Sequence, residues 1–152
     1  MDMKKLFLSL LIGSALYVTA CADGKPTVAR TTDLPVLARN FLKKHFSTLA
    51  VNQVTVESRF IGKKYEVTLA GGGEIEFDKN GNWTKIDCRR NAMPESAVPG
   101  KILQYVKLHY PDYFVSVIEK EDGGYEVEMR DISSGHDIDL VFNGRQEFVR
   151  ID

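Results

Sequence analysis

The residues of this sequence that could support nucleophilic catalysis are one cysteine, Cys88, and three histidines. The histidines are His45, His109 and His136. A thiolate beside an imidazole base is a common nucleophile, but no local signature of a cysteine enzyme surrounds Cys88. A cysteine without a disulfide partner in its domain is more often buried as a small apolar residue. We therefore predict a partly or fully buried, slowly reacting thiol and no catalytic residue.

A second stretch, "DKNGNW", has the residue types of a calcium loop. It offers oxygen ligands at Asp78, Asn80 and Asn82. A calcium loop of this kind would also need glycine where Trp83 stands and a bidentate glutamate where Arg89 stands. An Asn-Gly hairpin turn explains the same letters without a metal.

His45 and His109 occupy equivalent positions near the ends of two predicted helices, which suggests a paired zinc site. A protonatable residue in the last helical turn also favours the negative end of the helix dipole, which explains both positions without zinc. Neither histidine has a second ligand at a usable spacing. We therefore predict no bound metal and no cofactor.

Acidic residues at alternate positions of the predicted strands could perform acid–base chemistry or bind a basic partner. An open sheet face provides neither the burial nor the close pairing that separates carboxylate pKa values, so a solvated row or a binding surface is expected. Trp83 and Phe148 follow the predicted turns, where each ring either anchors a partner or packs between the two halves of the chain; we favour the second. The predicted partner-binding residues are Glu66, Glu74, Glu76, Glu126, Glu128, Asp137, Asp139 and Trp83.

Residues 1–22 have the pattern of an export signal. Two lysines precede an apolar run from Leu6 to Val18 that is too short to span a bilayer comfortably. The letters "VTAC" fit a lipoprotein signal in which Cys21 carries lipid, whereas "ACA" fits an ordinary cleavage site that removes Cys21. Both alternatives stay open. We predict a periplasmic or cell-envelope location, membrane contact only through lipid on Cys21, and a flexible tether over residues 23–33.

Two segments show the apolar spacing of amphipathic helices, beginning near Pro35 and Pro99. Each is followed by strand patterns with alternating apolar and polar residues, separated by glycine-rich breaks. The first helix is expected to bury one stripe, which consists of Leu34, Leu37, Ala38, Phe41, Leu42 and His45. The pattern predicts an α+β fold in which a helix packs on an antiparallel meander of about four strands.

The second half of the chain repeats the first after a shift of 64 residues. Pro99 then falls on Pro35. Further along the chain, "YEVEM" matches "YEVTL" and "DIDLVFNG" matches "EIEFDKNG", with two extra residues in the last turn. We therefore predict two tandem repeats, residues 34–88 and 98–152, joined by a linker over residues 89–97.

Composition limits the classes of partner. The 152 residues are 43% hydrophobic and 27% charged with a formal net charge of -1, which is typical of a globular protein. Nucleic acid is not an expected partner, because basic residues form no long run and do not alternate with aromatic ones. A monomer with a protein partner is predicted.

These blocks together carry a family resemblance. The pattern "YEV.L..G.EIEFD.NG.W..IDC", with a second unit beginning "VP..I..YV", resembles the PepSY-like family of exported bacterial proteins over Leu34 to Asp152. The resemblance implies a fold like that of the beta-lactamase inhibitor protein and a non-catalytic role; related modules occur in propeptides that inhibit metalloproteases. The second unit departs at "RDISSGHDIDLVF", where the turn is longer. Contact residues cannot be transferred, because the shared motif is structural.

Two functions of different class follow. The first is a non-catalytic envelope binding protein, such as a protease inhibitor or regulator, that uses the polar sheet face. The alternative is a small-molecule carrier or small enzyme with a pocket between the two repeats. A purely structural envelope component is a third option.

Overall fold

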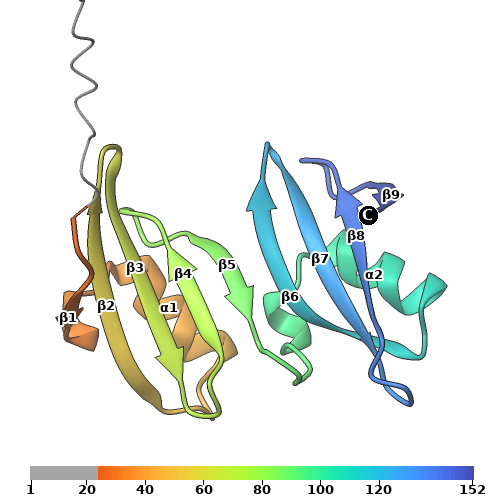
Figure 1. Cartoon of the computed structure of the whole chain (residues 1–152), viewed down its shortest axis with the longest axis horizontal. Helices are drawn as coiled ribbons and strands as arrows, with labels where there is room; N and C mark the ends of the chain where they lie inside the picture. Colours follow the sequence, from red (N-terminus) through yellow and green to blue (C-terminus); the bar gives the residue numbers. More distant parts are fainter. Residues whose placement is uncertain (1–23) are drawn as a thin grey trace, which may run out of the picture.

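A computed structural model describes residues 24–152, and the predicted export signal and Cys21 lie outside this range. The chain forms one nine-stranded antiparallel sheet in which the strands follow one another in sequence order. Two helices pack on the same face of this sheet and leave the opposite face uncovered (Figure 1). The predicted α+β class is confirmed.

The first half of the sheet carries helix α1. Its elements are β1 (Thr27–Ala29), the 3-10 turn η1 (Thr31–Asp33), α1 (Val36–His45), β2 (Val51–Arg59), β3 (Gly62–Leu69), β4 (Glu74–Phe77) and β5 (Trp83–Asp87).

The second half carries helix α2. Its elements are the 3-10 turn η2 (Glu95–Ala97), α2 (Gly100–His109), β6 (Tyr113–Glu121), β7 (Gly124–Asp131), β8 (Asp137–Phe142) and β9 (Phe148–Ile151).

The two halves share one sheet rather than forming two separate meanders. Strand β5 pairs with β6 through three residue pairs, which are Lys85 with Glu119, Ile86 with Ile118, and Asp87 with Val117. Ile86 and Ile118 are both fully buried at this seam. The pairing satisfies the backbone groups that a free edge of either meander would expose, so the halves join through hydrogen bonds as well as apolar contact.

The prediction of a flexible tether over residues 23–33 is wrong for its described part. Strand β1 pairs with β2, and the Gly24 amide donates to the Ser58 carbonyl at 2.8 Å. Arg30 and Asp33 then form an ion pair at 2.9 Å across η1. The polar, turn-rich composition suggested a linker, but the open edge of β2 provides hydrogen-bond partners for it.

Both helices start where the sequence predicted, because Pro35 and Pro99 are their N-cap residues. Within α1 the buried line is Ala38 and Leu42, continued by Leu34 before the helix and Phe46 after it. Leu37, which was expected in the buried stripe, is 54% exposed. The fully buried line therefore follows the four-residue spacing, and Phe41 packs on its edge with its ring 5.9 Å from that of Phe77. Leu37 lies beside the turn between β4 and β5.

The predicted alignment of the two halves is wrong in its last part. Tyr65 pairs with Phe77 and Tyr125 pairs with Phe142, so Phe142 is the counterpart of Phe77. The extra residues of the second half lie in the loop from β7 to β8, and the final turn has the same length as its counterpart. The sequence alone does not distinguish the two alignments, because a strand shifted by two residues keeps the same side chains on each face of the sheet.

No helix among residues 24–152 is long and apolar enough to cross a membrane.

Candidate partner-binding face

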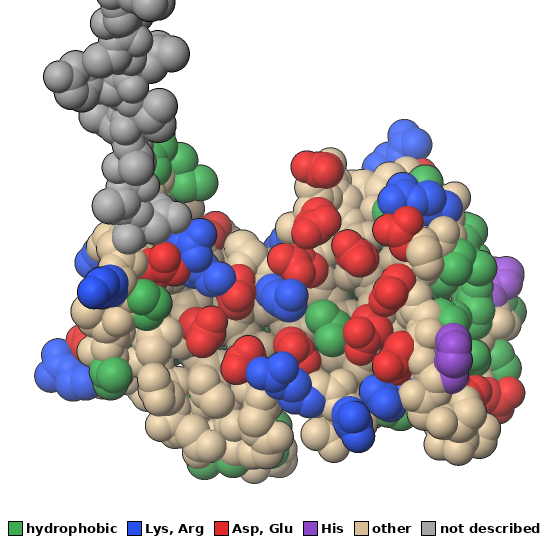
Figure 2. Space-filling model, viewed as in Figure 1, with side chains coloured by type: hydrophobic (Ala, Val, Ile, Leu, Met, Phe, Trp, Pro, Cys, Tyr) green, Lys and Arg blue, Asp and Glu red, His purple; other side chains and the backbone are tan. Residues whose placement is uncertain are grey.

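We define the open sheet face as the side of the nine strands that the helices do not cover (Figure 2). Val67 and Ile75 are buried toward the helices, so their neighbours in sequence point to the other side. The predicted carboxylates that the strand pairing places on this open face are Glu66, Glu74, Glu76, Glu126, Glu128, Asp137 and Asp139.

The strand register arranges these carboxylates in two rows that cross the seam between the halves. The first row runs through Glu66, Glu76, Lys85, Glu119 and Glu126, each directly opposite the next. The second row runs through Glu74, Asp87, Val117, Glu128 and Asp139. Like charges directly opposite one another in a sheet destabilise it, so these rows need either cations or solvent to hold them.

In the first half, the chain provides the cations. Lys64 pairs with Glu76 at 2.6 Å, and Arg89 pairs with Glu74 at 2.8 Å. The Arg89 guanidinium also lies 3.5 Å from Asp87. This part of the open face is therefore close to neutral in its local charge.

The second half keeps a negative excess. Lys85 reaches across the seam to Glu119 at 2.7 Å and Arg130 pairs with Asp137 at 3.1 Å, but no cation of residues 24–152 pairs with Glu126 or Asp139. Figure 2 shows Asp and Glu side chains gathered over this half. Partial burial, followed by the charges of the surrounding carboxylates, raises the pKa of Glu126. A carboxylate here is held in a repulsive field.

Ser116 is a contributor to this face that the sequence analysis missed. It is fully buried at a bulge in β6, and its hydroxyl donates to a carboxylate oxygen of Glu128 at 2.7 Å. This bond fixes the orientation of Glu128 in the second row. A bulge interrupts the alternation of side chains, so the period-two pattern assigned Ser116 no role.

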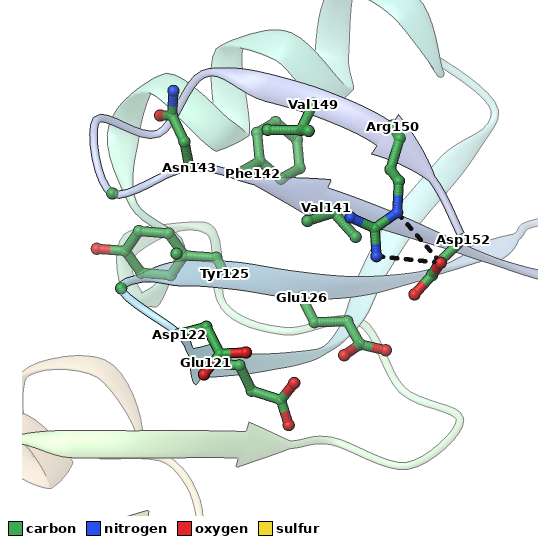
Figure 3. Close-up of a pocket in the computed structure, with 13 residues that line it drawn as sticks. Glu121, Asp122, Tyr125, Glu126, Val141, Phe142, Asn143, Val149, Arg150 and Asp152 are labelled. Atoms are coloured by element: carbon green, nitrogen blue, oxygen red, sulfur yellow. Dashed lines mark hydrogen bonds and ion pairs between the residues drawn. The ribbon is translucent and has the colours of Figure 1, made fainter.

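A pocket of about 320 Å³ opens beside the acidic rows, between the β6–β7 and β8–β9 hairpins (Figure 3). Glu121 and Glu126 extend in the same direction from the first hairpin, and Arg150 on β9 donates to Asp152 at 3.2 Å. Val141 lies between these charged groups. The pocket can accommodate one long side chain from a partner, and its acidic wall favours a cationic one.

Residues 63–150 match the family described as "Putative beta-lactamase-inhibitor-like, PepSY-like", which covers more than half of the chain. The chain belongs to this PepSY-like family.

Solved structures support this membership. A "putative calcium-regulated periplasmic protein" from Bacteroides thetaiotaomicron is 36% identical with a TM-score of 0.75, over 84% of this chain and 96% of that one. A putative periplasmic protein from Bacteroides vulgatus is 32% identical with a TM-score of 0.75, over 84% of this chain and 97% of that one. Another from Bacteroides vulgatus, of unknown function, is 31% identical with a TM-score of 0.73, over 84% and 98%. These relatives support export to the periplasm.

The search of curated proteins gave no match.

Trp83 of the PepSY-like chain lies at the seam, on the helix side of the sheet. Its ring is 6.3 Å from that of Tyr125, and the Lys120 ammonium lies 4.0 Å from its centre. Phe148 does not join it, because its ring stacks on Tyr105 of α2 at 4.9 Å. A role for Trp83 in partner binding stays a prediction. A partner that contacts Trp83 would do so on the helix side of the sheet, opposite the open sheet face.

The turn suggested as a calcium loop uses its oxygen atoms within the chain. One carboxylate oxygen of Asp78 accepts from the Asn80 amide at 2.8 Å and from the Asn82 amide at 2.9 Å. Asn143 repeats the arrangement in the second half, where its side-chain oxygen accepts from the Arg145 and Glu147 amides. These contacts explain the residue types by turn geometry.

The other candidate groups have structural surroundings. Burial raises the pKa of Cys88 to about 11, so its thiol is protonated at neutral pH. His45 lies 2.8 Å from the Ser96 hydroxyl, and burial lowers its pKa. His109 packs on Tyr105 with ring centres 4.3 Å apart. Within residues 24–152, no group of three or more metal-type side chains is placed to hold an ion.

Proposed function

We propose that this PepSY-like chain is a non-catalytic binding protein of the periplasm or cell envelope, and that it binds a basic protein surface through its open sheet face. The observation that carries the proposal is the pairing of like charges in the second half. Glu119 faces Glu126, and Glu128 faces Asp139, in adjacent strands. Such pairs reduce the stability of the free protein.

A cationic partner would turn this repulsion into attraction. Glu126 and Asp139 have no cation within residues 24–152, so their charge is available to a partner. The pocket beside them has room for one lysine or arginine side chain, and Val141 offers an apolar contact for its stem. Same-sign charge over a broad face also accelerates the encounter with an oppositely charged surface.

A protease inhibitor or regulator is the function we favour within this class. The family description names inhibitors, and inhibition by covering an enzyme requires a wide complementary surface rather than a catalytic residue. A face of nine strands provides such a surface.

We also infer that the two halves are repeats of one ancestral unit. Each half has a helix of 10 residues capped by proline, then strands of 9 and 8 residues. Each also has a bulge before the phenylalanine that ends its next strand, Phe77 or Phe142. In this view the second copy lost the cations that neutralise the first, which fits a specialised binding half.

The alternative of a small-molecule carrier or small enzyme has less support. It would require a pocket between the halves, where Ile86 and Ile118 pair and are fully buried. The pocket of Figure 3 lies within the second half instead.

The test uses envelope extract and the purified exported protein as bait. One bait carries Glu126→Gln with Asp139→Asn, and a control carries Glu95→Gln with Asp112→Asn, which removes the same charge outside the rows. A photo-crosslinking residue at Val141 or, as a control, at Lys43 on α1 identifies the contact surface. We expect the first double variant to lose most of the captured partner, with the difference shrinking at high salt.

Crosslinks should form from Val141 and not from Lys43. Equal capture by both double variants, or crosslinks from Lys43 alone, would remove the open sheet face from consideration. Circular dichroism of each variant confirms that a lost interaction does not reflect unfolding.

A further inference from the structure

The hairpin between β2 and β3 ends in two uncovered apolar side chains. Phe60 is 84% exposed and Ile61 is 82% exposed, the two largest values for large hydrophobic side chains among residues 24–152. The turn itself does not require them, because Gly62 with φ +125° provides the unusual backbone conformation. Two adjacent apolar side chains at a hairpin tip indicate a surface that something else covers.

Cations surround this tip. Lys63 and Lys79 are exposed beside it, and Lys25 is exposed in the segment that leads into β1. None of the three forms an ion pair with residues 24–152. The nearby carboxylate of Glu57 is already paired with Arg59 at 2.7 Å. The tip therefore combines apolar side chains with a local positive charge.

The start of the described chain lies at the same end of the molecule. Gly24 donates its amide to Ser58, which is two positions before Phe60. Cys21, the candidate for lipid attachment, is only three residues before Gly24. Three residues span at most about 11 Å, so a lipid on Cys21 would hold the tip at the membrane surface.

We propose that the β2–β3 hairpin tip inserts Phe60 and Ile61 into an anionic phospholipid surface, with Lys25, Lys63 and Lys79 at the headgroups. Stable membrane attachment generally takes two signals, and a lipid chain with a basic apolar tip forms such a pair. This inference concerns how the chain is held, and it does not depend on which protein binds the open sheet face.

The second hairpin determines how the molecule is tilted on the membrane surface. The β6–β7 tip points to the same end as the β2–β3 tip (Figure 1), but it carries Glu121 and Asp122. An anionic surface repels these carboxylates while it attracts the first tip. The first half therefore approaches the lipid, and the acidic rows of the second half stay in water, open to a partner.

The test places a fluorescent reporter at the tip. The full chain is produced with its own N-terminal segment and purified in its processed form, with Trp83→Phe to remove the one native tryptophan and Phe60→Trp at the tip. A matched control carries Trp83→Phe and Leu108→Trp, because Leu108 on α2 is 76% exposed and far in sequence from the tip. Vesicles contain phosphatidylethanolamine with phosphatidylglycerol, or phosphatidylcholine alone, with brominated acyl chains as quenchers.

We expect the tip tryptophan to shift to shorter wavelength and to be quenched by phosphatidylglycerol vesicles, while the tryptophan at position 108 stays unquenched. Lys63→Gln and Lys79→Gln should each weaken vesicle binding about five-fold, because one basic residue near an anionic surface contributes about that factor.

Equal quenching at both positions, or equal quenching by phosphatidylcholine, would overturn the proposal. If Trp83→Phe prevents folding, co-sedimentation replaces fluorescence. Phe60→Ser with Ile61→Ser should then weaken binding to phosphatidylglycerol vesicles and Leu108→Ser should not; equal binding by the two variants would overturn the proposal. A tip variant that loses a captured protein but keeps its vesicle binding would show that the tip binds protein instead.

Discussion

Replacing Glu126 with glutamine should stabilise the protein at neutral pH. Glu126 lies directly opposite Glu119, and burial together with the surrounding carboxylates raises its pKa. Like charges opposite one another across a strand pair cost about 0.2–1 kcal/mol, and the Lys85 contact with Glu119 at 2.7 Å reduces this. We therefore expect Glu126→Gln to raise the free energy of unfolding by about 0.5 kcal/mol, or the Tm by about 1–3 °C.

The pH dependence identifies the cause. Because the folded pKa of Glu126 lies above its ordinary value of 4.5, its contribution to stability is fully present below the unfolded pKa. That contribution is lost as the pH rises through the folded pKa. The gain from Glu126→Gln should thus be largest at neutral pH and disappear near pH 4.

Urea denaturation at neutral and acidic pH measures both effects. Glu95→Gln is the matched control, because Glu95 is paired with Lys107 at 2.7 Å and its loss should leave stability unchanged or slightly lower. A lower stability of Glu126→Gln at neutral pH, or a gain that does not change with pH, would refute the repulsive field. The rows would then be an ordinary solvated surface. The capture experiment completes this test. If Glu126→Gln raises stability and lowers the amount of captured partner, the carboxylate serves binding at the expense of stability, which a merely solvated face would not show.

Three further predictions concern the scaffold. Gly81→Ala should lower the free energy of unfolding by roughly 2–4 kcal/mol in urea denaturation, and Gly71→Ala should lower it by about 1 kcal/mol. Both glycines have positive φ, but only a Cβ at Gly81 would meet the Ala38 amide nitrogen, at 2.8 Å. Equal losses would show that the β4–β5 turn is not packed on α1. Hydrogen bonds from Ser133 and Ser134 lower the pKa of Asp131 to about 2. The stability that this carboxylate contributes should therefore be present above about pH 4 and be lost toward pH 2. In thermal melts over a pH series, Asp131→Ala should reduce the fall in Tm between about pH 4 and about pH 2. Cys88 should react with a thiol reagent far more slowly in the folded than in the unfolded chain at neutral pH, because burial raises its pKa to about 11; equal rates would reopen a role as nucleophile.

The sequence predicted which side of β3, β4, β7 and β8 faces the helices, because alternation determines this locally. Val67, Ile75 and Val127 are buried as the pattern required, and their acidic neighbours lie on the open sheet face. It could not predict the rows, because a row depends on register between strands that the chain connects through a helix. Glu119 was not a predicted site residue, yet it joins the two halves through its contact with Lys85.

The difference in charge between the halves also required the structure. Composition showed acidic residues in both, but the position of cations relative to them depends on which side chains cross between strands. Lys64 and Arg89 reach the carboxylates of the first half, so Glu74 and Glu76 are poor targets for a test of binding. Charge reversal there would break ion pairs and confuse a loss of stability with a loss of binding.

Lys85 has a particular place in this arrangement, because it is the one cation in the first acidic row. It lies between Glu76 and Glu119, and these carboxylates, with Glu119 as the largest cause, raise its pKa. The row therefore alternates in charge at the seam. Beyond the seam it carries Glu126, and the register then continues through Val141 to Arg150 on β9. A basic partner that follows the row would meet repulsion from Lys85 and Arg150 at its two ends and attraction from Glu126 between them. This places the centre of the proposed interface over β6–β8 and makes the first half a support that holds those strands in register.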